Sequence, residues 1–380
     1  MSSAKAKVRR FAEYDWDLTS QTSSSAFSDL HWHPCRFPSQ LPAVILGRFA
    51  NSGDLVFDPF VGSGTSAYEA QRLGLNFVGF DINPISCLVS EAKTLKYSSK
   101  YVSTQIELHK KFVLTNLNRY SKSDFPTTVQ ARKWYTDKTL EKLCSLWNLI
   151  HSETPEISSS LLSLFEFCFS AVLMPACRET RHWGYICDNT TPKSIRERDV
   201  LSLYFNALDR VATAYQLREK AIKVSEMGKV KIVLADSREM LQHVAPRSAT
   251  CFVTSPPYFG VADYAKSQRL SMEWFGYEIE TYRKKEIGAR SKRHRKTAEQ
   301  EYITELRQVF DEAFIALKRG GWGIIVFGES PKRKSVKEIF ATNLETTGFK
   351  IMSDSSRQIS EYRRQFPSLK NENILLIKKK

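Results

Sequence analysis

The stretch Asp58-Pro59-Phe60-Val61-Gly62-Ser63-Gly64-Thr65 stands between a strand pattern and a helix pattern. Apolar residues 55–57 come directly before it, and residues 65–73 carry apolar side chains at helical spacing. A second apolar run, residues 77–80, ends at Asp81. Strand, loop, helix and strand within about thirty residues form a βαβ unit, whose two strands are parallel. The stretch therefore predicts an α/β fold with a mostly parallel sheet.

The loop between the first strand and its helix has the features of a ligand-binding loop. It lies at the carboxyl end of a parallel strand, where doubly wound folds bind ligands. Gly62 and Gly64 let the backbone approach a ligand without interference from a Cβ atom, and Asp58 can accept hydrogen bonds from a ligand ammonium group. The loop lacks the Lys-Ser/Thr ending of a Walker A sequence. A glycine turn without a ligand is the alternative.

The second strand ends in an acid, Asp81, about twenty residues beyond the loop, where such a side chain meets the ribose hydroxyls of a nucleoside cofactor. The alternative is an ordinary helix N-cap, because Asn83-Pro84 follows. Together the two sites favour a nucleoside cofactor that carries an amino-acid group and no pyrophosphate. S-adenosyl-L-methionine fits that description.

The rest of the chain predicts one sheet domain interrupted by helices. Residues 1–30 are rich in Ser, Thr and charge with little periodicity, which predicts a flexible arm. Residues 31–100 form the cofactor-binding half, and residues 101–228 have mainly helical periodicity. Residues 229–380 form the catalytic-loop half, with strand signals at 230–234, 250–254, 322–327 and 374–377.

A second motif, Thr254-Ser255-Pro256-Pro257-Tyr258, directly follows the apolar strand 249–253. Consecutive prolines stiffen the backbone and have no N–H, so their carbonyls and the Ser255 side chain can point at a ligand in fixed directions. Tyr258 offers a flat face. These parts can hold a planar base by its amino group and stack on its ring. The alternative is a Pro-rich surface turn.

The two motifs together resemble the DNA amino-methyltransferases, the family that modifies N6 of adenine or N4 of cytosine. The resemblance extends to His33-Pro34 with Phe37-Pro38, to residues 77–84, 233–240, 258–276 and 317–328, and covers roughly 31–95 and 229–380. It implies a Rossmann-like fold dependent on S-adenosylmethionine, with a seven-stranded sheet whose last strand is antiparallel.

The resemblance also implies roles for single residues. The segment around His33 closes over the methionine part of the cofactor, and Asp236 contacts its adenine. The expected cofactor-binding residues are His33, Pro34, Phe37, Asp58, Pro59, Phe60, Gly62, Gly64, Thr65, Asp81, Ile82, Asp236 and Ser237. The expected catalytic residues are Ser255, Pro256, Pro257 and Tyr258.

The expected reaction is methylation of cytosine N4, because Ser at the first position of the catalytic motif accompanies cytosine enzymes in this family. Adenine N6 and an RNA base are the alternatives. Methylation of cytosine C5 is excluded, since it requires a nucleophilic Cys where this loop has Ser255-Pro256-Pro257. The target base must leave the duplex to reach the methyl group. We expect Tyr258 to stack on it, while Ser255 and the Pro256 carbonyl accept hydrogen bonds from its amino group.

The charge balance indicates a polyanionic partner. Lys and Arg number 56 against 41 Asp and Glu, a formal net charge of +15, and double-stranded DNA is the expected partner. A basic cluster follows the catalytic loop, within a predicted DNA-binding loop at 277–300, and an Arg pair lies in the insertion, which we expect to recognise the target sequence. The expected DNA-binding residues are Arg178, Arg181, Arg283, Lys284, Lys285, Arg290, Lys292, Arg293, Arg295 and Lys296. A solvated charged loop is the alternative.

The remaining features predict a reduced, intracellular protein. The seven cysteines are scattered without a CxxC pair, and Cys177, His182 and Cys187 fit no common zinc module, so no metal is expected. No apolar run approaches the roughly 20 residues of a membrane span, and no signal peptide is evident. We expect a cytoplasmic, nucleoid-associated monomer of a prokaryotic restriction-modification system. Its cognate endonuclease would act on the same site without stable binding.

Overall fold

The computed structural model describes residues 4–18, 27, 29–33, 38–117, 131–152, 158–177, 197–292, 294–328, 335–359 and 370–380. Within these residues the strands are β1 (Leu55–Asp58), β2 (Asn76–Asp81), β3 (Val230–Leu234), β4 (Ala249–Thr254), β5 (Leu317–Gly328), β6 (Phe349–Gln358) and β7 (Asn371–Lys379).

The helices outside the central insertion are α1 (Ala4–Ala12), α2 (Gln40–Phe49), α3 (Thr65–Arg72), α4 (Pro84–Thr94), α10 (Tyr264–Ser267), α11 (Arg269–Trp274), α12 (Ile279–Lys285), α13 (Ala298–Ala316) and α14 (Ser335–Thr347). The insertion contains α5 (Ser99–Asn116), α6 (Ala131–Trp134), α7 (Asp137–His151), α8 (Ser159–Ala176) and α9 (Val200–Ala221). The described residues also form the short 3-10 helices η2 (Val224–Glu226), η3 (Ser237–Gln242) and η4 (Arg290–Lys292).

The strands form one seven-stranded sheet in the order β3-β2-β1-β4-β5-β7-β6. The strand pairs from β3 to β5 are parallel, and β7 is antiparallel to both of its neighbours. The order reverses between β2-β1 and β4, so the loops after β1 and β4 meet at a topological switch point. The predicted α/β methyltransferase fold, with seven strands and an antiparallel last strand, is confirmed.

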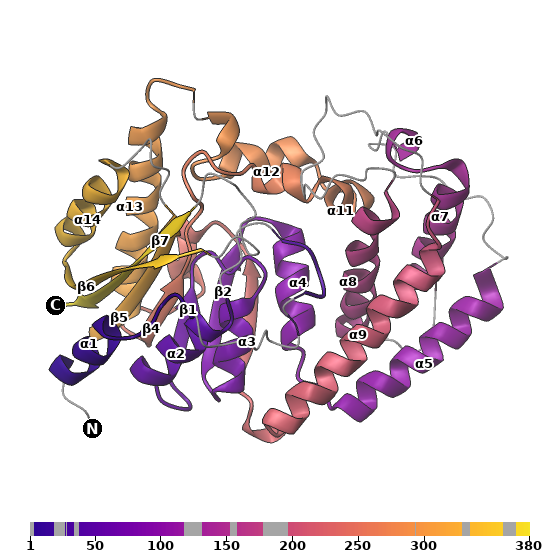
Figure 1. The fold of residues 1–380 in the computed structure, drawn as a ribbon, viewed down its shortest axis with the longest axis horizontal. Helices are drawn as coiled ribbons and strands as arrows, with labels where there is room; N and C mark the ends of the chain where they lie inside the picture. The colour runs from indigo at the N-terminus through magenta and orange to yellow at the C-terminus, as the bar shows by residue number, and fades with distance from the viewer. Residues whose placement is uncertain are drawn as a thin grey trace.

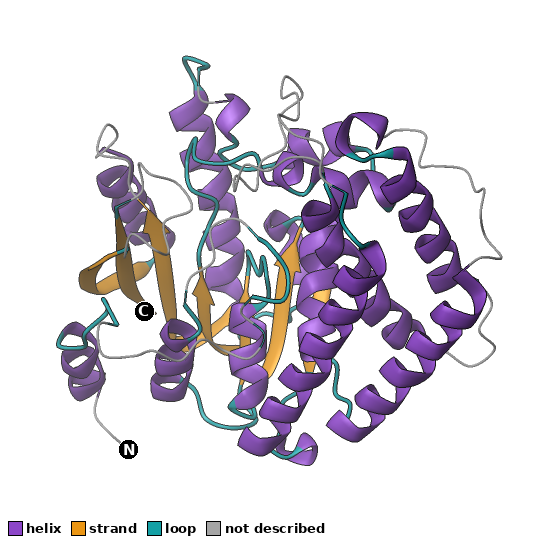
Figure 2. Ribbon diagram, turned by 45° about the vertical axis from the view of Figure 1, so that its right-hand side comes forward, coloured by secondary structure: helices purple, strands orange, loops and turns teal. Residues whose placement is uncertain are grey.

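Strands β1, β2, β4, β5 and β7 are largely buried on both faces, which explains their nearly continuous apolar runs. Alternate residues point to opposite faces, as the period of two requires. Val56 packs with α1, α2 and α3, whereas its neighbour Phe57 packs with η3, α13 and α14. Cys251 and Phe252 divide between the faces in the same way. Helices therefore cover the two sides of the sheet, as Figure 2 shows.

The long helices of the insertion stand beside the sheet rather than on it (Figure 1). They share a second apolar core, to which α4 and α11 contribute residues. Helices α11 and α12 lie in the upper part of the molecule, between the sheet and this bundle (Figure 1). The segment that follows the catalytic loop thus connects the sheet with the helical bundle of the insertion.

The N-terminal segment is not the loose arm that its composition predicts. Phe11 and Trp16 are fully or nearly fully buried in the core beneath α2, and the Trp16 indole donates a hydrogen bond to the Phe11 carbonyl at 3.0 Å. Two aromatic side chains supply this anchoring, and they are too few to produce a periodic signal. The prediction of a flexible arm is wrong for residues 4–18.

Two further elements depart from the sequence expectations. Strand β6 was not predicted, because Phe349–Gln358 is largely polar and lies at the edge of the sheet, paired only with β7. Helix α8 is, among the described residues, long and apolar enough to cross a membrane, with a mean hydropathy of 1.5. The expectation that no run approaches such a length is therefore wrong. More than half of α8 is buried in the insertion core, since neighbouring helices surround it.

Candidate functional site

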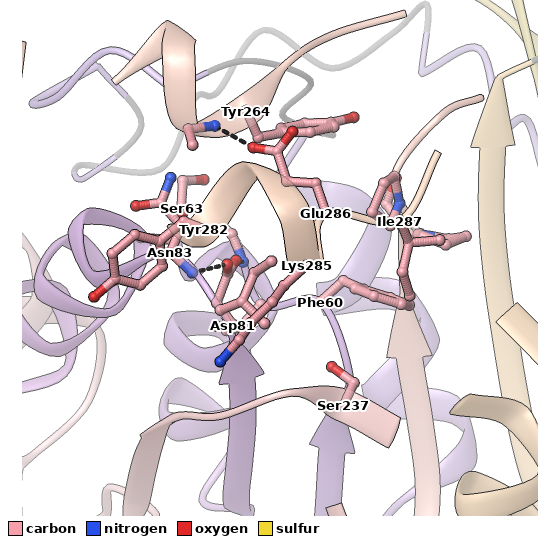
Figure 3. Close-up of a pocket in the computed structure, with 18 of the residues that line it drawn as sticks. Phe60, Ser63, Asp81, Asn83, Ser237, Tyr264, Tyr282, Lys285, Glu286 and Ile287 are labelled. Atoms are coloured by element: carbon pink, nitrogen blue, oxygen red, sulfur yellow. Dashed lines mark hydrogen bonds between the residues drawn. The ribbon is translucent and has the colours of Figure 1, made fainter. Parts of the chain in front are cut away.

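A pocket opens at the carboxyl ends of the parallel strands, at the switch point. It encloses about 960 Å³, including open solvent at its mouth. Segments far apart in the sequence turn side chains towards it, as Figure 3 shows. Of the expected cofactor-binding and catalytic residues, those that line it are His33, Phe60, Gly62, Thr65, Asp81, Ile82, Asp236, Ser237, Ser255, Pro256 and Pro257. The tertiary structure thus joins both predicted motifs in one cavity.

The glycine loop is held against α4. Gly62 and Gly64 have positive φ values of 51° and 73°, which glycine adopts without strain. The Ser90 hydroxyl donates to the Gly62 carbonyl at 2.9 Å, and the Lys93 ammonium donates to the Ser63 carbonyl at 2.6 Å. These two donors fix the loop backbone, so Gly64 lies behind the pocket wall and Gly62 on it.

Asp58 is a buried organiser of the two motifs rather than a side chain on the pocket wall. Its carboxylate accepts hydrogen bonds from the Phe60 amide at 2.9 Å and from the hydroxyls of Ser66 and Thr254, each at 2.5 Å. Burial raises the pKa of Asp58 to about 6, although these donors oppose the shift. The expected contact with a ligand ammonium group is corrected. Asp58 instead ties the cofactor loop to the residue before Ser255.

Asp81 lies on the pocket wall with its carboxylate beside the glycine loop. It accepts from the Gly62 amide at 3.1 Å and from the Asn83 amide at 2.8 Å. Burial raises its pKa to about 6, against the effect of these amides. The N-cap of α4 is Asn83, whose side chain accepts from the Ile85 amide. The alternative role of Asp81 as an ordinary N-cap is therefore not needed.

Asp236 and Ser237 line the pocket from the end of β3, but each already has protein partners. The Asp236 carboxylate pairs with the Arg238 guanidinium, with bonds of 2.9 and 2.5 Å. Burial raises the pKa of Asp236, but the bonds and charge of Arg238 hold it below its ordinary value. The Ser237 hydroxyl donates to the Pro59 carbonyl. Pro59 thus contributes its backbone to the packing of the wall and does not line the pocket.

The segment that the resemblance assigns to cofactor closure is represented by His33. Its ring is buried, lines the pocket and shares a hydrogen bond of 3.0 Å with the Ser86 hydroxyl. A Cβ atom on Gly62 would lie 3.3 Å from this ring. The wall is therefore tightly closed where the glycine loop meets His33. Pro34 and Phe37 lie outside the described residues.

The catalytic loop places Ser255, Pro256 and Pro257 on the pocket wall, but it turns Tyr258 away. The Tyr258 side chain is 2% exposed within the core under α13. Its hydroxyl accepts from Ser255 at 3.1 Å and donates to Glu372 at 2.8 Å. The expectation that this ring stacks on the target base is not met in this conformation, because the buried carboxylate holds the hydroxyl inward.

Parts of the chain are similar to known proteins. The family model described as DNA methylase, of the N6/N4 methyltransferases, matches residues 5–92. The Type II methyltransferase M.MjaII of Methanocaldococcus jannaschii is 36% identical over 110 residues, 28% of this chain and 19% of that protein. The Type II methyltransferase M.MvaI of Kocuria varians is 26% identical over 246 residues, 59% and 51% of the two chains. Residues 5–92 thus match the model of the DNA methylase family, and both relatives are Type II methyltransferases.

The chain spans about half or less of the length of these curated relatives. Similar solved structures include the rRNA methyltransferase aviRa from Streptomyces viridochromogenes, 11% identical with a TM-score of 0.40 over 97% of this chain and 94% of that one. A putative DNA modification methylase from Thermus thermophilus is 20% identical, with a TM-score of 0.23 over 38% and 50%. The family match begins at residue 5, so α1 belongs to the matched region.

The residues of the pocket fit S-adenosyl-L-methionine, the expected cofactor of the DNA amino-methyltransferase family. Gly62 has a positive φ and no side chain, and the Asp81 carboxylate lies beside it. These two features suit a nucleoside that approaches the backbone closely. The loop has no lysine at the Walker A position, and no group of three His, Cys, Asp or Glu side chains able to hold a metal occurs in the described part of the chain. His182 and Cys187 lie outside that part.

Sequence reasoning missed one wall of the pocket. Tyr264, Tyr282, Glu286 and Ile287 line it together with Lys285 (Figure 3). They come from α10, α12 and the residues after α12. Tyr264 lies in the stretch 258–276, which was only matched to the family, and the others lie in the predicted DNA-binding loop at 277–300. The single acid within that basic run, Glu286, is the one signal that could have indicated a buried position.

The basic cluster is divided by the structure. Arg283 pairs with Glu280, and Arg295 lies 3.7 Å from Glu301. The Lys292 ammonium donates to the Lys284 and Glu286 carbonyls at the end of α12. Lys285 lies at the pocket, while Lys284, Arg290 and Lys296 are exposed. Arg178, Arg181 and Arg293 lie outside the described residues. Of the predicted phosphate-binding cluster, the exposed members therefore remain the candidates for contacts with DNA.

Glu286 gives the pocket wall a pH-dependent stability. It is 4% exposed, and one carboxylate oxygen accepts from the Ala265 amide while the other has no hydrogen-bond partner among the described residues. Burial raises its pKa to about 7; Asp263 adds to this rise, whereas the Ala265 amide, Lys292 and Arg283 oppose it. A carboxyl whose pKa is raised in the folded state stabilises the fold fully at pH values below its pKa in the unfolded chain. This stabilisation is lost as the pH rises through about 7.

We therefore expect Glu286→Gln to stabilise the protein at pH 8.5 by about 2 kcal/mol relative to its effect at pH 4.5, since the amide never carries the buried charge. Thermal unfolding of both proteins at the two pH values measures the difference. The exposed Glu278→Gln is the matched control and should show none. An equal effect of Glu286→Gln at both pH values would contradict the expectation.

Proposed function

We propose that this protein transfers a methyl group from S-adenosylmethionine to N4 of a cytosine turned out of double-stranded DNA. The observation that carries the proposal is that Ser255-Pro256-Pro257 and the cofactor residues Gly62 and Asp81 line one pocket. Such an arrangement brings a methyl donor and an amino group into one cavity. Proximity and orientation then supply much of the rate acceleration.

The cofactor would lie between the glycine loop and the ends of β2 and β3. Asp81 would accept hydrogen bonds from the ribose hydroxyls, and the backbone at Gly62 would allow close approach. Phe60 and Ile82 offer apolar surface for the adenine, beside Asp236 and Ser237. The bound cofactor supplies an electrophilic methyl group. The chain's own residues hold both reactants and exclude water.

The target ring would lie against the catalytic loop. The Ser255 hydroxyl oxygen and the Pro256 carbonyl would accept from the amino group, which directs the nitrogen lone pair towards the methyl group. Tyr264 lines the pocket and its hydroxyl accepts from the Tyr258 amide at 3.3 Å, so its ring lies next to the loop. We assign the stacking role to Tyr264 in place of the buried Tyr258. No covalent enzyme intermediate is involved.

The choice of cytosine rests on Ser255. In this family Ser at that position accompanies N4-cytosine enzymes, whereas Asp or Asn accompanies N6-adenine enzymes. The two curated relatives are named as Type II methyltransferases, which fits a role in restriction-modification. Methylation would then protect a site against a cognate endonuclease that binds DNA independently of this protein.

Nucleoside mass spectrometry tests the proposal directly. Purified protein, S-adenosylmethionine and unmethylated plasmid DNA should yield N4-methyldeoxycytidine, and sequencing of the modified sites should give a defined target. Total RNA serves as the competing acceptor. N6-methyldeoxyadenosine as the product would overturn the choice of base, methylation of RNA alone would overturn the choice of substrate, and no product with either acceptor would overturn the activity.

The exposed basic residues near the pocket should dominate the salt dependence of DNA binding. We expect Lys284→Ala, Arg290→Ala and Lys296→Ala each to lower the slope of log affinity against log salt by about 1, because each removes one phosphate contact. Fluorescence anisotropy with a labelled duplex at several salt concentrations measures the slope. Lys220→Ala, at the exposed end of α9, is the control. Equal slopes for all four variants would place the DNA elsewhere.

A further inference from the structure

A buried series of hydrogen bonds leads from the pocket wall to strands β7 and β6 at one side of the sheet. Ser255 lines the pocket, and its hydroxyl donates to Tyr258 at 3.1 Å. The Tyr258 hydroxyl donates to Glu372 at 2.8 Å, and the second oxygen of Glu372 accepts from Arg357 at 2.6 and 2.5 Å. Tyr258, Glu372 and Arg357 are each at most 5% exposed. Water therefore does not compete for these bonds.

The antiparallel last strand explains why Glu372 reaches the catalytic loop. The parallel strands end at the pocket edge, so a strand of opposite direction begins there. Glu372 is the second residue of β7 and pairs with Gly328, the last residue of β5. On its other side it stands opposite Arg357 of β6 in the register. The ion pair is thus a cross-strand pair fixed by the sheet, next to the loop that follows β4.

In this series of hydrogen bonds, the donor and the acceptor of each bond are fixed. Arginine has only donors, and the carboxylate that it holds has only acceptors. Tyr258 has one hydroxyl proton and gives it to Glu372, so its oxygen accepts from Ser255. Ser255 in turn has one proton, which is used in the bond to Tyr258. The Ser255 oxygen can then only accept hydrogen bonds on its pocket side.

We propose that Arg357, Glu372 and Tyr258 are positioning residues that select an exocyclic amino group over a carbonyl in the target base. The inference deepens the proposed function and rests on it. An amino group donates to the Ser255 oxygen, whereas a carbonyl at the same ring position would face a second acceptor with no proton between them. Rejection of this kind is effective because a buried polar group left unpaired costs about 1–3 kcal/mol. The selection applies equally to cytosine against uracil and to adenine against hypoxanthine.

Two variants change the direction of these hydrogen bonds in different ways. In Glu372→Gln the amide can donate to Tyr258, whose proton then turns to Ser255, and the Ser255 proton is released towards the pocket. In Tyr258→Phe the ring and the ion pair remain, but Ser255 loses its acceptor and its proton is free to rotate. Both variants should therefore tolerate a carbonyl that the native protein rejects.

The test measures binding, so the variants need not turn over. Duplexes carry the target site mapped for the native protein, with the methylated base either present or replaced by its carbonyl counterpart, and S-adenosylhomocysteine occupies the cofactor site. We expect the native protein to prefer the amino base by about 10-fold or more. The preference should fall about 10-fold in Tyr258→Phe and in Glu372→Gln, while the Pro256 carbonyl retains part of it.

The controls separate selection from folding and from the proposed function. Glu273→Gln disrupts another largely buried ion pair, with Arg269 at 2.6 Å, and should lower the melting temperature without changing the preference. In a Ser255→Ala background, Tyr258→Phe should have almost no further effect, because it acts through Ser255. An unchanged preference in a folded Tyr258→Phe protein, or additive effects with Ser255→Ala, would overturn the inference. A native protein without methylation activity would instead overturn the proposed function.

Discussion

Replacement of Asp81 by Asn is expected to weaken S-adenosylmethionine binding by about 100-fold, which corresponds to about 2.7 kcal/mol. The carboxylate lines the pocket and is held in place by the amides of Gly62 and Asn83 and by the Ser86 side chain. Hydrogen bonds to a charged acceptor are worth about 1.5–3 kcal/mol each. Weakening of the hydrogen bonds from two ribose hydroxyls to this one carboxylate accounts for the expected loss of affinity. Isothermal titration calorimetry with S-adenosylhomocysteine as well as the cofactor measures it.

Asp236→Asn is the matched comparison, because this second pocket carboxylate is already paired with Arg238. We expect a loss of less than about 10-fold there, since a ligand gains less from an oxygen whose charge is shared. Comparable losses in the two variants would contradict the assignment of the ribose contact to Asp81.

The affinity should also depend on pH. Burial raises the pKa of Asp81 to about 6, and the cofactor hydroxyls bind the ionised form better. Affinity in the native protein should therefore fall as pH drops through 6, by up to about 10-fold per pH unit. Asp81→Asn should remove that dependence apart from the contribution of nearby Asp58, which titrates in the same range.

Gly64→Ala is expected to destabilise the folded protein by about 3 kcal/mol and to abolish cofactor binding. A residue with a side chain at φ +73° costs about 1–2 kcal/mol, and forcing atoms into a filled site costs a further 1–3 kcal/mol. The new Cβ would lie 2.8 Å from the Ser90 Cα, which is backbone and cannot rotate away. The loop or α4 must therefore move. Urea unfolding followed by circular dichroism measures the stability, and titration with the cofactor measures the binding.

Gly53→Ala isolates the backbone part of that cost. Gly53 has a φ of +87°, but no atom lies within 4 Å of a Cβ built on it. We expect a loss of about 1–2 kcal/mol with unchanged cofactor binding. If Gly64→Ala were no worse than Gly53→Ala, the contact between the glycine loop and α4 would not shape the site.

The local patterns predicted the elements that position the site, because their causes are local. The strand 55–57 with its glycine loop and the strand 230–234 appear as β1 and β3, since apolar period and turn residues determine them within a few positions. The edge strand β6 and the anchoring of α1 were missed. Both depend on partners distant in sequence, β7 in the first case and the sheet core in the second.

The roles of single polar residues were predicted less well, because a role depends on which partners surround a side chain. Asp58 and Tyr258 were each expected to contact a ligand, and the structure gives both of them buried protein partners. Lys285 and Glu286 were interpreted as part of a charged loop, and the fold places both on the pocket wall. In each case the structure changed the partners or the position that the sequence had led us to expect for the side chain.

The sequence by itself determined the fold class and located the glycine loop and the Ser-Pro-Pro segment, both of which line the pocket. Those features follow from short-range patterns: the apolar period of a strand, the freedom of Gly62, and the rigidity of two prolines. Only the tertiary structure decided which side chains face the pocket and how Ser255 is oriented. That orientation depends on Glu372, brought to the loop because one antiparallel strand begins where the parallel strands end.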